Sequence, residues 1–185
     1  MDTIKRALAA FVEILEIAAI AIVTVLIIRN FLVQPFLVNG ASMEPNFSNN
    51  DYLLIDELSY RFREPTRGEV IVFRYPGDES TFYIKRIIGL PGERVAINDG
   101  VISVFAEDDT TGLSLQETYL SPGIFTRGDT NVSLGPSEYF VLGDNRSYSF
   151  DSRSWGTLPK DNLIGLVRLR LWPLTKVQAF EAPAY

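Results

Sequence analysis

The strongest constraint on this chain is a long apolar run close to its N-terminus. From Ile17 to Ile28 no residue is charged, and Thr24 is the only polar one. Extended back to Leu8, the run reaches the roughly 20 residues, at about 1.5 Å each, that a helix needs to cross about 30 Å of hydrocarbon. The sequence therefore predicts one transmembrane helix within residues 1–33.

Acidic residues leave the limits of this helix open. Glu13 and Glu16 lie in the first half of the run, one helical turn apart. A span centred on Ile14–Val33 is the alternative, with Arg29 extending its side chain to the far membrane surface.

The orientation follows from two basic residues that precede the run. Lys5 and Arg6 predict a cytoplasmic N-terminus by the positive-inside rule. A buried core helix is one alternative, but a helix this apolar would need a large partner surface. A cleavable secretory signal is another, and cutting near residues 38–40 would release everything downstream. We interpret the run as an uncleaved, single-pass anchor in the cell membrane.

After Pro35 the sequence predicts β-structure. Short runs rich in β-branched and aromatic residues alternate with turn residues, and no sustained helical period follows residue 33. The expected strands are Tyr52–Ile55, Glu69–Tyr75, Thr81–Gly89, Arg94–Ile97, Val101–Phe105, Glu138–Leu142 and Leu163–Trp172. Asn98-Asp99-Gly100 between two of them predicts a hairpin. The expected organisation is an all-β domain over residues 34–185, in which about 100–137 form a surface insertion, with Glu107–Arg127 as a solvated excursion.

Two missing residue types narrow the chemistry. The 185 residues include no cysteine, which excludes disulfides, thiolate nucleophiles and cysteine-ligated zinc or iron–sulfur sites. They include no histidine, which excludes a Ser-His-Asp triad and histidine-ligated catalytic metals. A carboxylate, lysine or tyrosine would have to move protons near neutral pH. The net charge of −6 argues against nucleic acid as a partner, and we expect no cofactor or metal.

Ser42 is a candidate nucleophile because of its surroundings. It follows Gly40-Ala41, where small residues let the backbone approach a substrate, and Pro45 restricts the chain after it. An ordinary turn serine is the open alternative.

Lys85 is a candidate base. It lies in the apolar strand-like run Thr81–Gly89, where alternation places Tyr83 on the same face. Desolvation lowers the pKa of a lysine, about 10.4 in water, by up to several units and so makes a neutral amine available. The alternative is a solvated lysine that protects an edge strand from aggregation.

A third cluster, residues 143–156, holds two aspartates, two arginines and four serines. Paired Asp and Arg side chains at this density indicate a hydrogen-bonded platform. Ser149 within it is placed to hold a lysine amine.

Together these clusters resemble the type I signal peptidases, membrane-anchored serine proteases that remove secretory signal peptides. The resemblance extends from the apolar run to about Trp172. The family's motifs are matched in order by Ser42-Met43-Glu44-Pro45, Arg67–Phe73, Tyr83–Glu93, Gly143-Asp144-Asn145-Arg146, Ser149, Asp151-Ser152-Arg153 and Gly156.

The resemblance implies a mainly β, antiparallel sheet or barrel-like catalytic domain outside the cytoplasm, with Ser42 as nucleophile and Lys85 as general base. Secretory preproteins would be cut after Ala-X-Ala-like sites through small apolar pockets, close to the lipid bilayer, into which Phe47 is hypothesised to dip. Supporting or orienting roles are implied for Ser149, Gly40, Met43, Tyr83, Asp144, Arg146, Asp151 and Arg153.

Two positions depart from the family's pattern. Asn46 replaces the usual threonine after the proline, and Gly40 stands where some members carry a serine that joins the oxyanion hole. A second oxyanion donor is therefore not assigned.

Two other functions compete. A self-cleaving Ser-Lys repressor shares the fold and the residue pair, but it would carry a DNA-binding segment in place of residues 1–33. A catalytically silent, membrane-anchored β module that binds peptides or partner proteins is the alternative from a different class.

Overall fold

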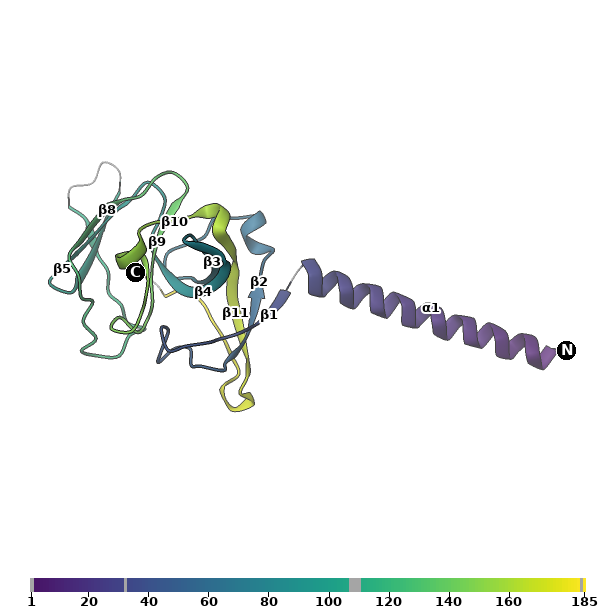
Figure 1. The fold of residues 1–185 in the computed structure, drawn as a ribbon. Helices are drawn as coiled ribbons and strands as arrows, with labels where there is room; N and C mark the ends of the chain where they lie inside the picture. The colour runs from purple at the N-terminus through teal and green to yellow at the C-terminus, as the bar shows by residue number, and fades with distance from the viewer. Residues whose placement is uncertain (1, 32, 107–110, 184) are drawn as a thin grey trace.

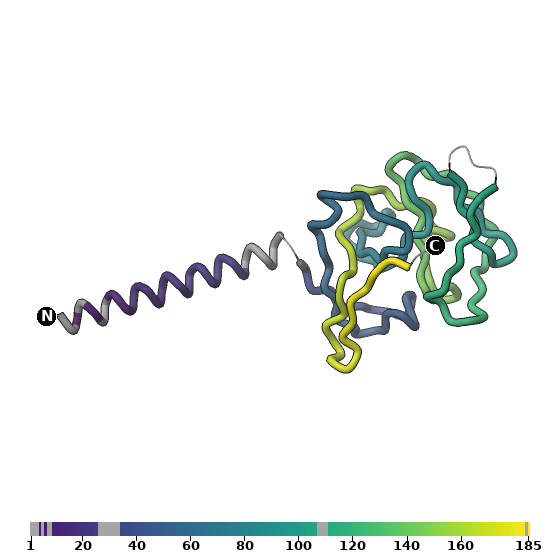
Figure 2. Tube along the Cα trace, turned by 180° about the vertical axis from the view of Figure 1, so that it is seen from behind, coloured from purple at the N-terminus to yellow at the C-terminus, as the bar shows by residue number. Residues whose placement is uncertain are grey.

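In the computed structural model a single long helix precedes a β domain (Figure 1). The structure describes residues 2–31, 33–106, 111–183 and 185. The helix, α1 (Asp2–Phe31), projects away from the β domain, as the view from behind also shows (Figure 2).

The described side chains of α1 lack a protein partner surface. From Ala9 to Val25 every residue is exposed, including large apolar ones such as Ile17 and Ile20. The ends of the predicted membrane span, Leu8 and residues 26–28, lie outside the described side chains. Within the described part of the chain, no helix is long and apolar enough to cross a membrane.

The β domain consists of two antiparallel sheets. The larger sheet has the strand order β1-β2-β11-β3-β4-β9-β10, with β12 also paired to β11. Its strands are β1 (Val33–Leu37), β2 (Tyr52–Asp56), β3 (Val70–Tyr75), β4 (Asp78–Gly89), β9 (Glu138–Leu142), β10 (Leu158–Pro159), β11 (Leu163–Trp172) and β12 (Gln178–Ala179). The smaller sheet has the order β7-β6-β5-β8. It comprises β5 (Arg94–Asn98), β6 (Val101–Phe105), β7 (Leu113–Ser114) and β8 (Thr130–Ser133).

Short helical turns connect several strands. They are α2 (Ser152–Trp155) and the 3-10 turns η1 (Ser59–Arg61), η2 (Lys160–Asn162) and η3 (Leu174–Lys176).

All seven predicted strands are present, and their limits agree with the predicted ones to within three residues. The strands that the pattern missed are β1, which contains Pro35, and the short β7, β8, β10 and β12. Proline lacks a ladder donor, so it argues against a strand unless the strand lies at a sheet edge, and β1 is the edge of its sheet.

The predicted hairpin is confirmed. Asn98 pairs with Val101, which leaves Asp99 and Gly100 as a two-residue turn. Both have positive φ, 49° and 82°, the conformation of a type I′ turn.

Residues 111–127, the described part of the expected solvated excursion Glu107–Arg127, are mostly exposed, but a few of their side chains contact the β domain. Leu115 and Thr126 are buried, and Glu117 and Tyr119 bond to an arginine inside the β domain. The acidic residues 107–109 lie outside the described part. These inward contacts, whose partners a local pattern cannot reveal, attach a largely exposed segment to the β domain.

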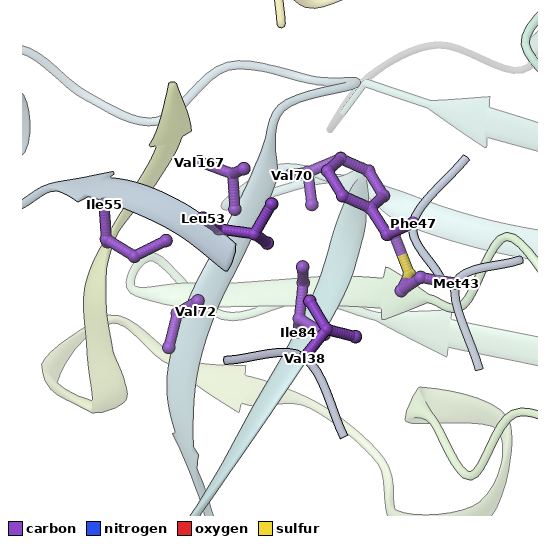
Figure 3. Packing of buried hydrophobic residues seen from close by; sticks show 9 residues of the cluster. All are labelled: Val38, Met43, Phe47, Leu53, Ile55, Val70, Val72, Ile84 and Val167. Carbon is purple, nitrogen blue, oxygen red and sulfur yellow. The ribbon is translucent and has the colours of Figure 1, made fainter. Parts of the chain in front are cut away.

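One apolar core cluster fixes the loop between β1 and β2. Met43 and Phe47 of this loop point toward Val70, Ile84 and Leu53 of the larger sheet (Figure 3). The hypothesis that Phe47 faces the bilayer is wrong, because its side chain is fully buried.

Candidate active site

Ser42 lies in a tight turn whose neighbours anchor it to the core. Phe47 N donates to Met43 O at 2.9 Å, and both side chains are buried. Gly40 has φ +107°, a conformation that glycine adopts without strain, and its N–H donates to Asn49 Oδ1 at 2.9 Å. Ser42 itself stays partly accessible.

Lys85, 43 residues further along the chain, meets this turn from β4. Its Nζ lies 2.7 Å from Ser42 Oγ and donates to Ile84 O at 2.8 Å. The residue is only 3% exposed, and its Nζ lies 5.4 Å from the centroid of the Tyr83 ring. The fold therefore brings the two sequence-predicted residues into hydrogen-bonding contact.

Burial sets the protonation of Lys85. Desolvation lowers the pKa of its amine to about 8, while the charges of Asp151 and Asp144 act in the opposite direction. With a pKa near 8, part of the Lys85 amine is neutral at physiological pH, as a general base requires.

Asp144 is a fully buried carboxylate with charged and neutral partners. Arg86 Nε donates to its Oδ1 at 2.8 Å, and Arg86 Nη2 donates to its Oδ2 at 2.6 Å. Asn46 Nδ2 donates to the same Oδ2 at 2.8 Å. Such a bidentate pair fixes both partners in direction as well as distance.

The buried Asp151 pairs with Arg153, whose side chain is partly buried. Arg153 Nε and Nη2 each approach the Asp151 carboxylate at 2.8 Å. Asp151 Oδ2 also accepts from Gly143 N at 3.1 Å, which ties the platform to the end of β9.

Arg146 joins the platform to the segment that was expected on the surface. Its guanidinium donates to Glu117 Oε2 at 2.6 Å, to Thr126 Oγ1 and to Tyr119 Oη at 3.1 Å. The contacts hold these side chains in place, and the supporting roles of Asp144, Arg146, Asp151 and Arg153 stay predictions.

Sequence reasoning assigned no role to Asn145, which contacts the Ser42 turn directly. Its N–H donates to Ser42 O and its Nδ2 to Ala41 O, each at 3.0 Å. Beside it, Asp144 N donates to Met43 Sδ at 3.4 Å. The only signal in the sequence was the position of Asn145 inside the motif Gly143-Asp144-Asn145-Arg146.

Ser149 does not make the bond expected of it. Its Oγ is buried and makes no hydrogen bond to any described residue. Ser149 lies against Gly143, and its orienting role stays a prediction.

The site has no evident metal-binding group. Among the described residues, no three carboxylates gather in a way that would hold a metal ion. The available chemistry is that of a hydroxyl beside a buried amine, an arrangement suited to nucleophilic attack with proton transfer.

Comparison with known proteins identifies the family of this chain. Residues 11–172 match the model of a family described as signal peptidase, peptidase S26. A probable signal peptidase I-2 from Synechocystis sp. is 36% identical over 187 residues, covering 89% of this chain and 82% of the relative. A signal peptidase I from Leptolyngbya laminosa is 34% identical over 180 residues, covering 92% of this chain and 84% of the relative. Signal peptidase I P from Bacillus subtilis subsp. natto is 30% identical over 188 residues, covering 96% of this chain and 97% of the relative. The chain therefore belongs to the signal peptidase family, peptidase S26, and is a serine protease.

Proposed function

We propose that this chain is a membrane-anchored endopeptidase that removes signal peptides from secretory preproteins, with Ser42 as nucleophile and Lys85 as general base. The observation that carries the proposal is the 2.7 Å contact between Ser42 Oγ and a Lys85 amine whose pKa burial lowers to about 8.

In the proposed first step, the neutral Lys85 amine accepts the Ser42 hydroxyl proton as Oγ attacks the scissile carbonyl carbon. The Ile84 carbonyl accepts one N–H of Lys85 and so directs the lone pair toward Ser42. The Ser42 N–H is the proposed oxyanion donor, a type of contact whose loss typically lowers the rate by about 10²–10³.

The remaining steps return the enzyme to its starting state. The Lys85 ammonium protonates the leaving amine, which departs as the new N-terminus and leaves an acyl ester on Ser42. Neutral again, Lys85 takes a proton from water, whose hydroxide attacks the ester. Collapse of that intermediate frees the peptide carboxylate, and the proton returns to Ser42.

The free edge of β4 supports recognition of an extended peptide. β4 pairs with β3 along one edge, while on the other edge β9 reaches only Arg86–Gly89. Among the described strands, none covers the second edge of residues 78–85, which ends at Lys85. A substrate strand can add there through main-chain hydrogen bonds, and small residues at −3 and −1 would fit shallow apolar pockets flanking Ser42 and Lys85.

The exposed apolar surface of α1 supports the anchoring part of the proposal. A helix with residues such as Phe11, Ile14 and Ile22 more than half exposed needs an apolar surrounding, which a bilayer supplies. We propose a single span in the cell membrane, with residues 1–33 as cytoplasmic start and anchor and residues 34–185 outside the cytoplasm.

A cleavage assay with the full-length chain tests the mechanism. We expect Ser42→Ala and Lys85→Ala each to abolish cleavage of a preprotein with an Ala-X-Ala site. The matched controls are Ser133→Ala, at an exposed position of β8, and Lys160→Ala, at an exposed hydrogen bond, and both should cleave normally. Full activity in either site variant would refute the Ser42–Lys85 mechanism.

The same assay tests specificity and the competing function. A bulky residue at −1 of the preprotein should block cleavage. A chain that binds preprotein but never cleaves it, with Ser42 and Lys85 intact, would favour the silent β module.

A further inference from the structure

Asn46 is the residue of the Ser42 turn that makes the most polar contacts beyond the turn itself. Residues 41–43 already contact residues 144–145 through the bonds described above. Asn46 adds a further contact to this pair, because its Nδ2 donates to Asp144 Oδ2 at 2.8 Å. Asp144 therefore contacts both ends of the turn, through Met43 and through Asn46.

The Asn46 amide uses both of its N–H groups. The second contact from Nδ2 goes to Tyr119 O at 3.0 Å, in the segment 111–127. The backbone carbonyl of Asn46 accepts from Arg170 Nη2 of β11. A threonine hydroxyl has a single proton to donate and cannot make both side-chain contacts. Asparagine in place of the family's usual threonine thus links the Ser42 turn to Tyr119 in the segment 111–127 and to Asp144.

The acceptor of this bond is the carboxylate that Arg86 also holds. Arg86 reaches both oxygens of Asp144, and Asn46 supplies a further donor to Oδ2. Because Asp144 is 0% exposed, its carboxylate depends on protein donors in the unmodified chain. Removing the amide therefore leaves acceptor capacity unfilled, and Asp144 can shift relative to the Ser42 turn.

We propose that Asn46 is a positioning residue, whose amide holds the Ser42 turn in register with Asp144 and thereby places Ser42 Oγ at Lys85 Nζ. The proposal rests on the proposed roles of Ser42 and Lys85. Because the Asn46 amide controls the geometry of the reacting atoms, its loss should lower turnover more than substrate affinity.

Steady-state kinetics on the full-length chain test this role. Asn46→Ala removes both donors, and we expect kcat to fall about 10- to 100-fold with KM within about twofold, since a misplacement of about 1 Å costs on the order of 10² in rate. Asn46→Thr restores one donor and should recover part of the loss. The matched control is Asn131→Ala on β8, where the amide is exposed.

Charge provides a second readout. Asn46→Asp keeps the shape but places a carboxylate against Asp144. The charged groups that act on Lys85 are Asp144 and Asp151, which raise the pKa of its amine, and Tyr83 packs against it. A further negative charge nearby raises that pKa again. The midpoint of kcat/KM against pH should therefore move upward, by up to about one pH unit, whereas Asn131→Asp should leave it in place.

The outcomes separate this proposal from the proposed function. If the unmodified chain cleaves and Ser42→Ala does not, the function stands, and unchanged kcat in all Asn46 variants overturns only the positioning role. Circular dichroism gives the folded fraction. If kcat per folded molecule equals that of the unmodified chain, Asn46 serves stability alone and the proposal is also overturned. A graded fall, Ala below Thr below Asn, with KM unchanged supports it.

Discussion

Replacing Lys85 by methionine should change the stability of the β domain with a sign that depends on pH. Burial lowers the pKa of Lys85 from 10.5 to about 8, so below pH 8 the buried site disfavours the ammonium that the unfolded chain carries. At about 1.4 kcal/mol per pH unit, the resulting destabilisation is about 3 kcal/mol. It fades as the pH rises from 8 to 10.5, where the unfolded chain also loses its proton.

The substitution also removes favourable contacts. The bonds from Nζ to Ser42 Oγ and Ile84 O contribute about 1 kcal/mol each. Lys85→Met should therefore stabilise the fold by about 1 kcal/mol at pH 7 and destabilise it by about 2 kcal/mol at pH 10.5 and above, while it abolishes cleavage.

Urea unfolding of the full-length chain in detergent, followed by Trp155 and Trp172 fluorescence, measures both values. The other groups titrate alike in the two chains and cancel in the difference. The control is Lys160→Met, since that side chain is 38% exposed and pairs with Glu64 at the surface. A Lys85→Met difference that stays constant between pH 7 and 10.5 would refute a buried amine of lowered pKa.

Three further predictions concern the same site. The kcat/KM for preprotein cleavage should rise with pH to half its maximum near pH 8 and level off above about 9, because Lys85 must be neutral; a rise that continues past pH 10 contradicts this. Gly143→Ala should lower kcat on the order of 100-fold in the same assay, because a Cβ there collides with Ser42 O; near-normal turnover would show that the backbone yields. Glu117→Ala should destabilise the fold by about 3 kcal/mol in urea unfolding, because it leaves Arg146 buried without its carboxylate, and a loss below about 1 kcal/mol would argue against that pair.

The parts of this fold that the sequence predicts are those set by local patterns. Alternation of apolar residues locates the long strands, and Asp99-Gly100 locates a hairpin because few residue pairs tolerate positive φ at two successive positions. Lys85 is recognisable because it is a charged residue within an apolar run, Phe82–Ile88. In each case the determining residues lie within a few positions of one another.

The unpredicted parts depend on partners far apart in the chain. Nothing near Glu117 indicates that its carboxylate pairs with Arg146, 29 residues away. Likewise Asn46 meets Asp144 only because β1, β2 and the end of β9 converge after folding. An acidic or amide side chain in a loop is solvated by default, and only the assembled structure shows which ones become buried.

The arginine pairs also bear on the proposed role of Lys85 as a base in a chain without histidine. Asp144 and Asp151 both raise the pKa of Lys85, so two unpaired carboxylates there would favour the ammonium. Arg86 and Arg153 pair with these carboxylates and offset their charge. The burial of Lys85, which lowers the pKa of its amine, therefore outweighs the effect of the two carboxylates. In the proposed mechanism, residues that move no proton thereby help to keep the amine of Lys85 neutral. Substituting either arginine should accordingly shift the pH midpoint of cleavage upward, even where the 2.7 Å contact between Lys85 Nζ and Ser42 Oγ is retained.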